Sequence, residues 1–334
     1  MQTSGKKLPG AYGANEPKQN AANLRTKGWE LMLTWNDAFK LANKPFRYNL
    51  SVGLADNTSE ITKFDNPSKI LSDYYVGQKL GDIWGYVVDG LFRTDEEAAN
   101  YNVDQTAVNF VINTAQVNPG LHAGDMKFVD LDGDHTISSG SNTADDPGDR
   151  KIIGNSLPRY TYSIQGGFDW YGFDFSIYLQ GVGHQDWYPG TNSVFFWGPY
   201  ARPYSSFIPR DFLSQVWSPE NPDAYFPRPI GYLALGNNRS LGVVNDRYLQ
   251  NLAYCRLKNL SIGYTLPDKW LSKIGFEKIR VYFSGENLLT FTKLHSDYID
   301  PEQASASNSW KTSKSDANIY PWAKTYSFGV DITF

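Results

Sequence analysis

The chain has 334 residues, a formal net charge of −4, 15% aromatic residues and a single cysteine, Cys255. This length allows a large hydrophobic core or several domains. No run of about 18 apolar residues is present, which excludes a membrane-spanning helix. The absence of a basic cluster argues against nucleic acid as a partner, and one cysteine excludes an internal disulfide framework.

Seven stretches alternate strictly between apolar and polar residues, which predicts β-strands with one apolar face. In chain order these stretches are 28–35, 46–55, 160–170, 173–181, 257–266, 279–291 and 324–334. Their other faces carry Arg, Asp, Asn, Gln, Ser, Thr and Gly, which suit water better than a second packed layer. Strands of about ten residues are long enough for a tilted crossing of a bilayer.

The connections between these stretches are unequal in length. Short turns are predicted at Tyr171-Gly172 and, over about seven residues, around Ala38–Lys44, whereas residues 93–157, 183–247 and 294–319 form long connections. Such asymmetry is typical of outer-membrane barrels, which have short periplasmic turns and long external loops. The fold expected is therefore an all-β, antiparallel transmembrane β-barrel. The alternative is a soluble, secreted β-sandwich that binds carbohydrate through aromatic loops.

The long connections hold one candidate metal site, the stretch "DLDGDHTISSG". Asp130, Asp132, Asp134 and Thr136 occupy the first, third, fifth and seventh positions of an EF-hand-like loop, so their oxygens predict Ca²⁺ binding. His135 replaces the usual Gly at position six and Ser141 the usual Glu at position twelve. A carboxylate from Asp145, Asp146 or Asp149 would complete the ligand set. The alternative is an Asp/Gly turn closed by side-chain to backbone hydrogen bonds.

A second candidate site is the aromatic loop "QDWYPGTNSVFFWGPYARPY". Its aromatic side chains offer flat surfaces for a substrate such as a sugar, or for a protein partner, and its Asp and Asn could bind hydroxyl groups. The residues predicted for this role are Asp186, Trp187, Tyr188, Asn192, Phe195, Phe196, Trp197 and Tyr200. The alternative is a loop that packs its own aromatic side chains.

No enzymatic activity is predicted. Glu286, Asp300 and Glu302 are of the residue types that glycosidases use, but nothing in the sequence brings them together. The four histidines show no spacing typical of a zinc site. No cofactor is required by these patterns, with Ca²⁺ the one possible ion.

Eight ordered stretches resemble the C-terminal portion of the SusC/RagA family of TonB-dependent outer-membrane transporters. They run from about residue 17 to the end: "LRTKGWEL", "GQKLGDIWGYVVDGLF", "GDMKFVDLDGDHTI", "IIGNSLPRYTYSI", "VWSPENPDAYFPR", "RLKNLSIGYTLP", "SGENLLTFT" and "YPWAKTYSFGVDITF". The resemblance implies a 22-stranded barrel with long extracellular loops in the outer membrane of a Gram-negative bacterium. It also implies a SusD-like lipoprotein and the TonB complex as partners, membrane lipid around the barrel, and an oligosaccharide or peptide as substrate.

The resemblance sets further expectations about the ends of the chain. Phe334, on an alternating strand, is expected to be the signal that such barrels present to their assembly machinery. Residues 1–22 are expected to form a connecting loop and residues 23–334 the C-terminal part of the barrel, without a plug domain or the N-terminal strands. About eight to ten strands are expected here, and so small an open sheet would expose unpaired edges to lipid. The chain is therefore expected to be a fragment that does not transport alone.

Overall fold

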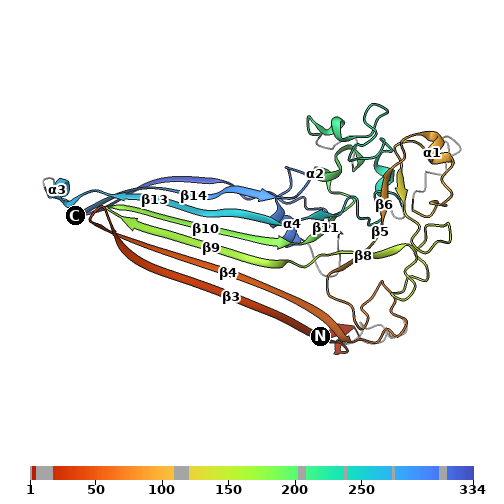
Figure 1. Ribbon diagram of the computed structural model, residues 1–334, viewed down its shortest axis with the longest axis horizontal. Helices are drawn as coiled ribbons and strands as arrows, with labels where there is room; N and C mark the ends of the chain where they lie inside the picture. Colours follow the sequence, from red (N-terminus) through yellow and green to blue (C-terminus); the bar gives the residue numbers. More distant parts are fainter. Residues whose placement is uncertain are drawn as a thin grey trace, which may run out of the picture.

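The computed structural model shows a long antiparallel sheet that carries an assembly of folded loops at one end (Figure 1). It describes residues 2–4, 18–108, 120–201, 208–236, 239–272, 275–307 and 314–334. Two short paired strands, β1 (Gln2–Ser4) and β2 (Lys18–Asn20), lie within the segment predicted to be a connecting loop. None of the described helices is long and apolar enough to cross a membrane.

Within the described residues, the main sheet has seven strands, one for each stretch predicted from alternation. In spatial order they are β16 (Thr325–Thr333), β14 (Lys278–Thr292), β13 (Tyr254–Thr265), β10 (Phe173–His184), β9 (Arg159–Trp170), β4 (Lys44–Lys63) and β3 (Asn23–Leu41). Every neighbouring pair is antiparallel. The sheet has fewer strands than the sequence analysis predicted, because the remaining extended segments pair in small sheets among the loops.

Two hairpins of the main sheet turn through two residues each. Ala42 and Asn43 have φ of 49° and 60°, and Tyr171 and Gly172 have φ of 49° and 86°. Positive φ at both central positions matches the right-handed twist of the strands that such a turn joins. The Tyr171-Gly172 turn is confirmed. The longer connection predicted around Ala38–Lys44 is wrong, because the strands pair right up to the turn.

The short and long connections lie at opposite ends of the main sheet, as the sequence predicted (Figure 1). The two hairpin turns, the connection that contains α3 (Asp268–Leu271) and the C-terminal residue share one end, which we call the hairpin end. The described residues of the segments 64–158, 185–253 and 293–324 lie at the other end. We call their assembly the loop domain.

The loop domain contains short strands and helices. Strand β5 (Asp82–Tyr86) pairs with β8 (Arg150–Asn155), β6 (Val88–Leu91) pairs with β7 (Met126–Phe128), and β11 (Asp186–Pro189) lies between β12 (Gln250–Asn251) and β15 (Lys314–Ser315). The helices are α1 (Asp95–Ala99), α2 (Val194–Trp197) and α4 (Pro301–Ser307), with 3-10 turns η2 (Gly198–Tyr200), η3 (Phe212–Gln215) and η4 (Tyr232–Leu235).

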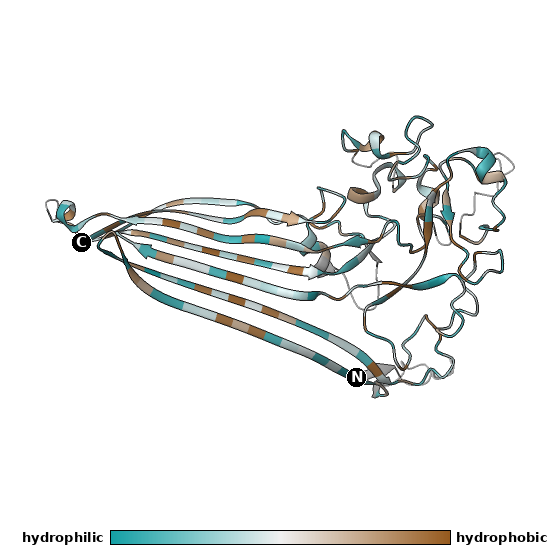
Figure 2. Ribbon diagram, in the orientation of Figure 1, coloured by the Kyte–Doolittle hydropathy of each residue, from teal (hydrophilic) through white to brown (hydrophobic). Residues whose placement is uncertain are grey.

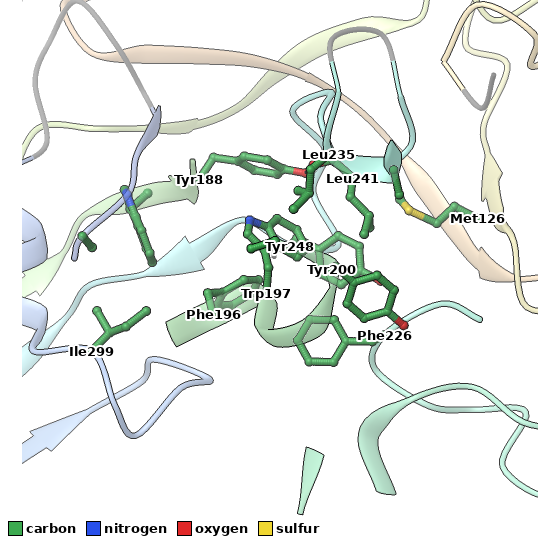
Figure 3. Close-up of a cluster of buried hydrophobic side chains, with 14 of the residues drawn as sticks. Met126, Tyr188, Phe196, Trp197, Tyr200, Phe226, Leu235, Leu241, Tyr248 and Ile299 are labelled. Carbon is green, nitrogen blue, oxygen red and sulfur yellow. The ribbon is translucent and has the colours of Figure 1, made fainter. Parts of the chain in front are cut away.

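The hydrophobic core lies in the loop domain and not against the main sheet. Side chains from segments far apart in sequence converge there, among them Met126, Tyr188, Trp197, Phe226 and Tyr248 (Figure 3). Their rings contact one another edge to face or stacked, with centroid separations of 5.2 Å for Trp197 and Tyr248 and 5.9 Å for Phe226 and Tyr248. The other sheets have two or three strands each, so the described residues do not form the β-sandwich of the alternative hypothesis.

Candidate functional site

The main sheet has one largely apolar face, with Asp37 of β3, opposite Tyr48, as an exception. The strand registers align the apolar residues of neighbouring strands in transverse rows, since side chains at alternate positions share a face. One row contains Tyr48, Phe168, Phe175, Ile262, Phe283 and Phe328, and the next toward the hairpin end contains Phe39, Phe46, Trp170, Phe173, Tyr264, Val281 and Val330. Hydrophobic and hydrophilic residues alternate in bands along the strands (Figure 2). Many of these apolar side chains are exposed, including Trp35, Leu50 and Phe328.

The aromatic side chains of this face form a band near the hairpin end. Phe46 stacks on Phe168 at 5.4 Å between ring centroids, and Phe168 stacks on Phe175 at 5.3 Å. Phe173 and Tyr264 extend the band at 4.5 Å. The residue that follows β16, Phe334, is 89% exposed at this end. Its role as an assembly signal stays a prediction.

The opposite face of the main sheet is polar. One transverse row holds only small or polar residues across all seven strands: Asn36, Asn49, Gly167, Ser176, Ser261, Ser284 and Ser327. Toward the hairpin end, the Arg280 guanidinium contacts the carboxylates of Asp174 at 2.6 Å and Asp331 at 3.3 Å. A Cβ at Gly263 would meet the Asp174 carboxylate and the Arg280 guanidinium, so a larger residue here would displace this ion pair. This face therefore presents charges and hydroxyl groups to solvent.

Helix α4 is held against the loop end of β13 by buried charges. The Arg256 guanidinium, 2% exposed, contacts Asp300 at 2.6 Å and Glu302 at 2.8 Å. Lys258 Nζ adds a contact to Glu302 at 2.7 Å and lies over the Trp322 ring at 5.3 Å. Two of the carboxylates that the sequence analysis weighed for catalysis are thus ion-paired. The sequence analysis missed Arg256, although Arg256 and Lys258 are cationic positions two residues apart on a predicted strand.

Most of the predicted aromatic site is buried in the core of the loop domain. Five of its eight residues have side chains that are almost inaccessible to solvent: Trp187, Tyr188, Phe196, Trp197 and Tyr200. Trp197 Nε1 donates to the Gly190 carbonyl at 2.9 Å and Tyr200 Oη to the Pro227 carbonyl at 2.6 Å. Such side chains cannot offer flat faces to a substrate, because they pack on one another, as the alternative reading held. Asn192 and Phe195 are exposed, and a substrate or partner role for them stays a prediction.

The remaining member of that predicted site, Asp186, joins the sheet to the loop domain. Its Oδ2 accepts a hydrogen bond from the Asn155 backbone amide at 2.8 Å and lies 3.0 Å from His184 Nε2. A Cβ at Gly154 would meet the Asp186 carboxylate, so glycine is needed at this close approach. The Asn155 side chain donates in turn to the Leu80 carbonyl and to Asp82. The Asp186 side chain is thus largely buried and hydrogen-bonded, although it also lines a cavity of about 430 Å³ together with His184 and Arg159, and a substrate role for it stays a prediction.

Three carboxylates of the acidic loop converge, though not the three predicted. Oxygens of Asp130, Asp132 and Asp149 lie within 4.8 Å of one another. Asp134 is outside this group, and its carboxylate accepts a hydrogen bond from the Thr136 amide at 2.7 Å. His135 makes the turn at position six with φ of 64°. Asp149, one of the three residues proposed to complete the ligand set, therefore takes the place that the sequence analysis gave to Asp134.

Hydrogen bonds and neighbouring charges shift the pKa of Asp132 in opposite directions in this acidic loop. The Asp134 amide lowers the pKa of Asp132, but burial and the carboxylates of Asp149, Asp134 and Asp130 outweigh it and leave that pKa above its usual value. The Asp130 carboxylate accepts hydrogen bonds from the amides of Gly133 and His135. Because a carboxylate has about four lone-pair sites, it can accept these and still bind a cation. Calcium binding at this loop stays a prediction.

Replacing Asp132 by Asn is expected to remove calcium protection of residues 124–150 from proteolysis. Millimolar Ca²⁺ should slow cleavage of the unsubstituted loop, with an affinity of about 10⁻⁴–10⁻³ M because a bidentate Glu is missing at position twelve. The matched control is Asp145→Asn, since Asp145 is exposed and pairs with Lys69 away from the three carboxylates. Identical cleavage with calcium and with a chelator would leave only the turn interpretation.

Comparison with known proteins identifies homologues of this chain. No family model matches the chain. In an alignment of 347 positions that covers 98% of the chain, it is 27% identical to the TonB-dependent receptor P3 of Formosa agariphila. Over 95% of the chain it is 24% identical to the TonB-dependent receptor SusC of Bacteroides thetaiotaomicron. The homologues of this chain are TonB-dependent receptors.

The fold agrees with this homology. The structure of the RagAB peptide importer in its open-open state superimposes with a TM-score of 0.62 over 100% of the chain, at 18% identity. A second structure, of the RagAB peptide transporter, gives a TM-score of 0.60 at 19% identity. The chain spans 30% of receptor P3, 27% of SusC and 31% of the RagAB chain. The mostly antiparallel sheet is thus the fold of the matching part of these TonB-dependent receptor homologues.

Proposed function

We propose that the chain forms part of the membrane-spanning wall of a TonB-dependent nutrient importer in the outer membrane of a Gram-negative bacterium. The observation that carries this proposal is the apolar face of the main sheet, which stays exposed across all seven strands while the core lies elsewhere. In water such a face would be costly, since monomeric soluble proteins rarely expose apolar patches larger than a few hundred Å². Against lipid it is the face that a barrel requires.

The dimensions of this face support the same arrangement. On β4, the apolar positions from Phe46 to Leu54 cover about 27 Å of strand, close to the height of the apolar band in such barrels. The aromatic band near the hairpin end suits the membrane interface, where aromatic girdles lie. The hairpin end would then face the periplasm and the loop domain the cell exterior. The polar face, with Asn49 and Asp331, would line the lumen.

The edges of the main sheet support its place in a larger barrel. Within the described residues, β3 and β16 are the two edge strands. Lipid does not tolerate edge strands with unpaired backbone groups, so further strands are required to close the sheet. We therefore place residues 23–334 in the C-terminal part of a 22-stranded barrel, as the resemblance implies. A SusD-like lipoprotein at the loop domain and the TonB complex are the partners proposed for the whole importer, and an oligosaccharide or peptide its substrate.

Cysteine labelling tests this orientation. In the importer in its membrane, cysteines placed at Leu50 or Phe328 should react with a lipid-soluble reagent, and cysteines at Asn49 or Asp331 should not. Leu50 and Asn49 lie on opposite faces of β4, and Phe328 and Asp331 on opposite faces of β16. Within each pair, a difference in labelling therefore reports which face of the sheet contacts lipid. Equal labelling of both sets would contradict a lipid-facing sheet.

A further inference from the structure

A polar cavity in the loop domain lies outside the features described so far. Its volume is about 590 Å³, within the range of small-molecule sites. Polar side chains from the segment after β4, from β5 and from the end of the acidic loop line it: Ser72, Asp73, Gln78, Asp82, Asn142 and Arg150. Tyr74 and Trp84 add aromatic surface. The cavity is therefore of the size and polarity that suit a small, polar ligand.

Arg150 brings a positive charge to this cavity that the protein does not neutralise. Its guanidinium donates to the carbonyls of Pro147 at 3.1 Å and Ser139 at 2.9 Å, and to Asn142 Oδ1 at 3.0 Å. All three acceptors are neutral, and no carboxylate of the described residues lies within 4.0 Å of it. Elsewhere in the protein, Arg256 and Arg228 contact carboxylates.

Two amide groups at the cavity also have free donors in the described part of the chain. Asn142 Oδ1 is occupied by Arg150, which leaves the Nδ2 hydrogens of Asn142 without an acceptor. Gln78 Oε1 accepts the Tyr75 amide at 3.3 Å, which leaves the Nε2 hydrogens of Gln78 in the same state. Arg150 Nη1 donates to no acceptor of the described residues, so its hydrogens and the neighbouring amide donors can each donate one hydrogen bond to a carboxylate. The donors thus favour an anionic group at this end of the cavity.

The two carboxylates at the cavity restrict what else the ligand can be. Asp82 accepts hydrogen bonds from Asn155 Nδ2 at 3.0 Å and from the Lys79 amide at 3.2 Å. Asp73 is exposed, with one oxygen bonded to the Tyr74 amide at 2.8 Å. These groups repel a bare anion but accept hydrogen bonds from hydroxyl groups. The cavity therefore selects against an inorganic anion and in favour of a larger ligand with hydroxyl groups.

We propose that this cavity binds a hydroxylated carboxylate, the chemistry of an acidic sugar unit. The ligand carboxylate lies at Arg150 and Asn142, and its hydroxyl groups donate to Asp73. Binding here does not depend on the import function, because it needs only the loop domain to be folded in the intact protein. Its failure would leave the lipid-facing sheet unaffected.

Calorimetry on the whole protein, purified from outer membranes in detergent, tests this site with three probes: sodium glucuronate, glucose and sodium sulfate. Glucuronate should bind about tenfold or more tightly than glucose, because a charged hydrogen bond is lost with the carboxylate. It should also bind more tightly than sulfate, which lacks hydroxyl groups for Asp73. Equal binding of glucuronate and glucose, or no binding of any probe at millimolar concentration, would overturn the proposal. Sulfate binding as tight as that of glucuronate would overturn it in favour of a bare anion site.

Two variants locate the binding at this cavity. Asn142→Asp keeps the size of the side chain and the oxygen that accepts from Arg150, but replaces the free donor by a carboxylate that neutralises Arg150. Gln78→Glu makes the same change at the second amide. It tests the cavity if the Asn142→Asp variant misfolds. Each should lower glucuronate affinity by about tenfold or more. The matched control is Asn100→Asp at the exposed C-cap of α1, which adds the same charge outside the cavity and should leave the affinity unchanged. Unchanged affinity in both cavity variants would overturn the proposal.

Discussion

Replacing Leu50 by Arg should lower the free energy of unfolding of the importer by about 2–4 kcal/mol, the cost measured for arginine on the lipid face at mid-membrane. Leu50 is 44% exposed and lies in the middle of the apolar face, in register with Trp35 on β3 and Gly166 on β9. Lipid cannot solvate a guanidinium, and most side chains in the neighbouring rows are apolar, with Asp37 opposite Tyr48 as the exception. Urea titration of the protein refolded in lipid vesicles measures the change.

The matched control for Leu50→Arg is Asn49→Arg. Asn49 is the preceding residue of β4, so the same charge enters the same strand on the opposite face. In the transverse row of Asn49 the neighbouring residues are Asn36 and Gly167, which leave room and water for a long polar side chain. This substitution should change stability little. A loss of similar size in both variants would show that the faces do not differ in environment, which would contradict the lipid-facing sheet.

Replacing Arg256 by Gln should lower the free energy of unfolding by about 3–5 kcal/mol, because removing one partner leaves buried carboxylates without their cation. Arg256 holds both Asp300 and Glu302, and its Nε donates to Thr290 Oγ1 at 3.0 Å. Lys258 can still pair with Glu302, so Asp300 bears most of the loss. The change should appear in the free energy of unfolding and as faster amide hydrogen exchange in α4, which Arg256 fastens to β13.

An exposed ion pair provides the control for Arg256→Gln. Arg25 contacts Glu60 at 2.9 Å, but the two side chains are 55% and 41% exposed. Water screens such a pair, and Arg25→Gln should cost less than about 1 kcal/mol. Amide exchange in α4 should not change in this variant. Equally small losses of unfolding free energy in the two arginine variants would mean that the charges between α4 and β13 do not hold the helix in place.

The acidic loop shows how far spacing alone can locate a candidate site. Alternation of Asp130, Asp132 and Asp134 predicted converging carboxylates, and two of the three do converge. The third ligand position depends on how the chain returns after the loop. The returning segment places Asp149 beside the loop, where its oxygens accept hydrogen bonds from the backbone amides of Leu131 and Ser138, each at 2.7 Å. That return is a non-local contact, so spacing could name Asp149 only as one of three choices.

The sequence alone located the seven strands of the main sheet and, outside the register shifts at Tyr178/Leu179 and Leu257/Asn259, which residue of each lies on which face. Both depend on the period of two in an extended backbone, which is a local property and needs no knowledge of neighbours. The positions of the short and long connections followed from the spacing of those strands. The resemblance to TonB-dependent transporters rested on motifs along the chain and agrees with the homologues found.

Only the tertiary structure decided which loop side chains are buried and which charges are paired. Trp187 and Trp197 look like exposed binding residues in a loop rich in Gly and Pro, but they lie in a core built from segments as distant as Met126 and Tyr248 (Figure 3). The cavity at Arg150 and the ion pairs of Arg256 likewise join residues far apart in sequence. Burial of an aromatic side chain and pairing of a charge depend on which distant segments arrive beside it, and the alternation of residues along one strand carries no information about that.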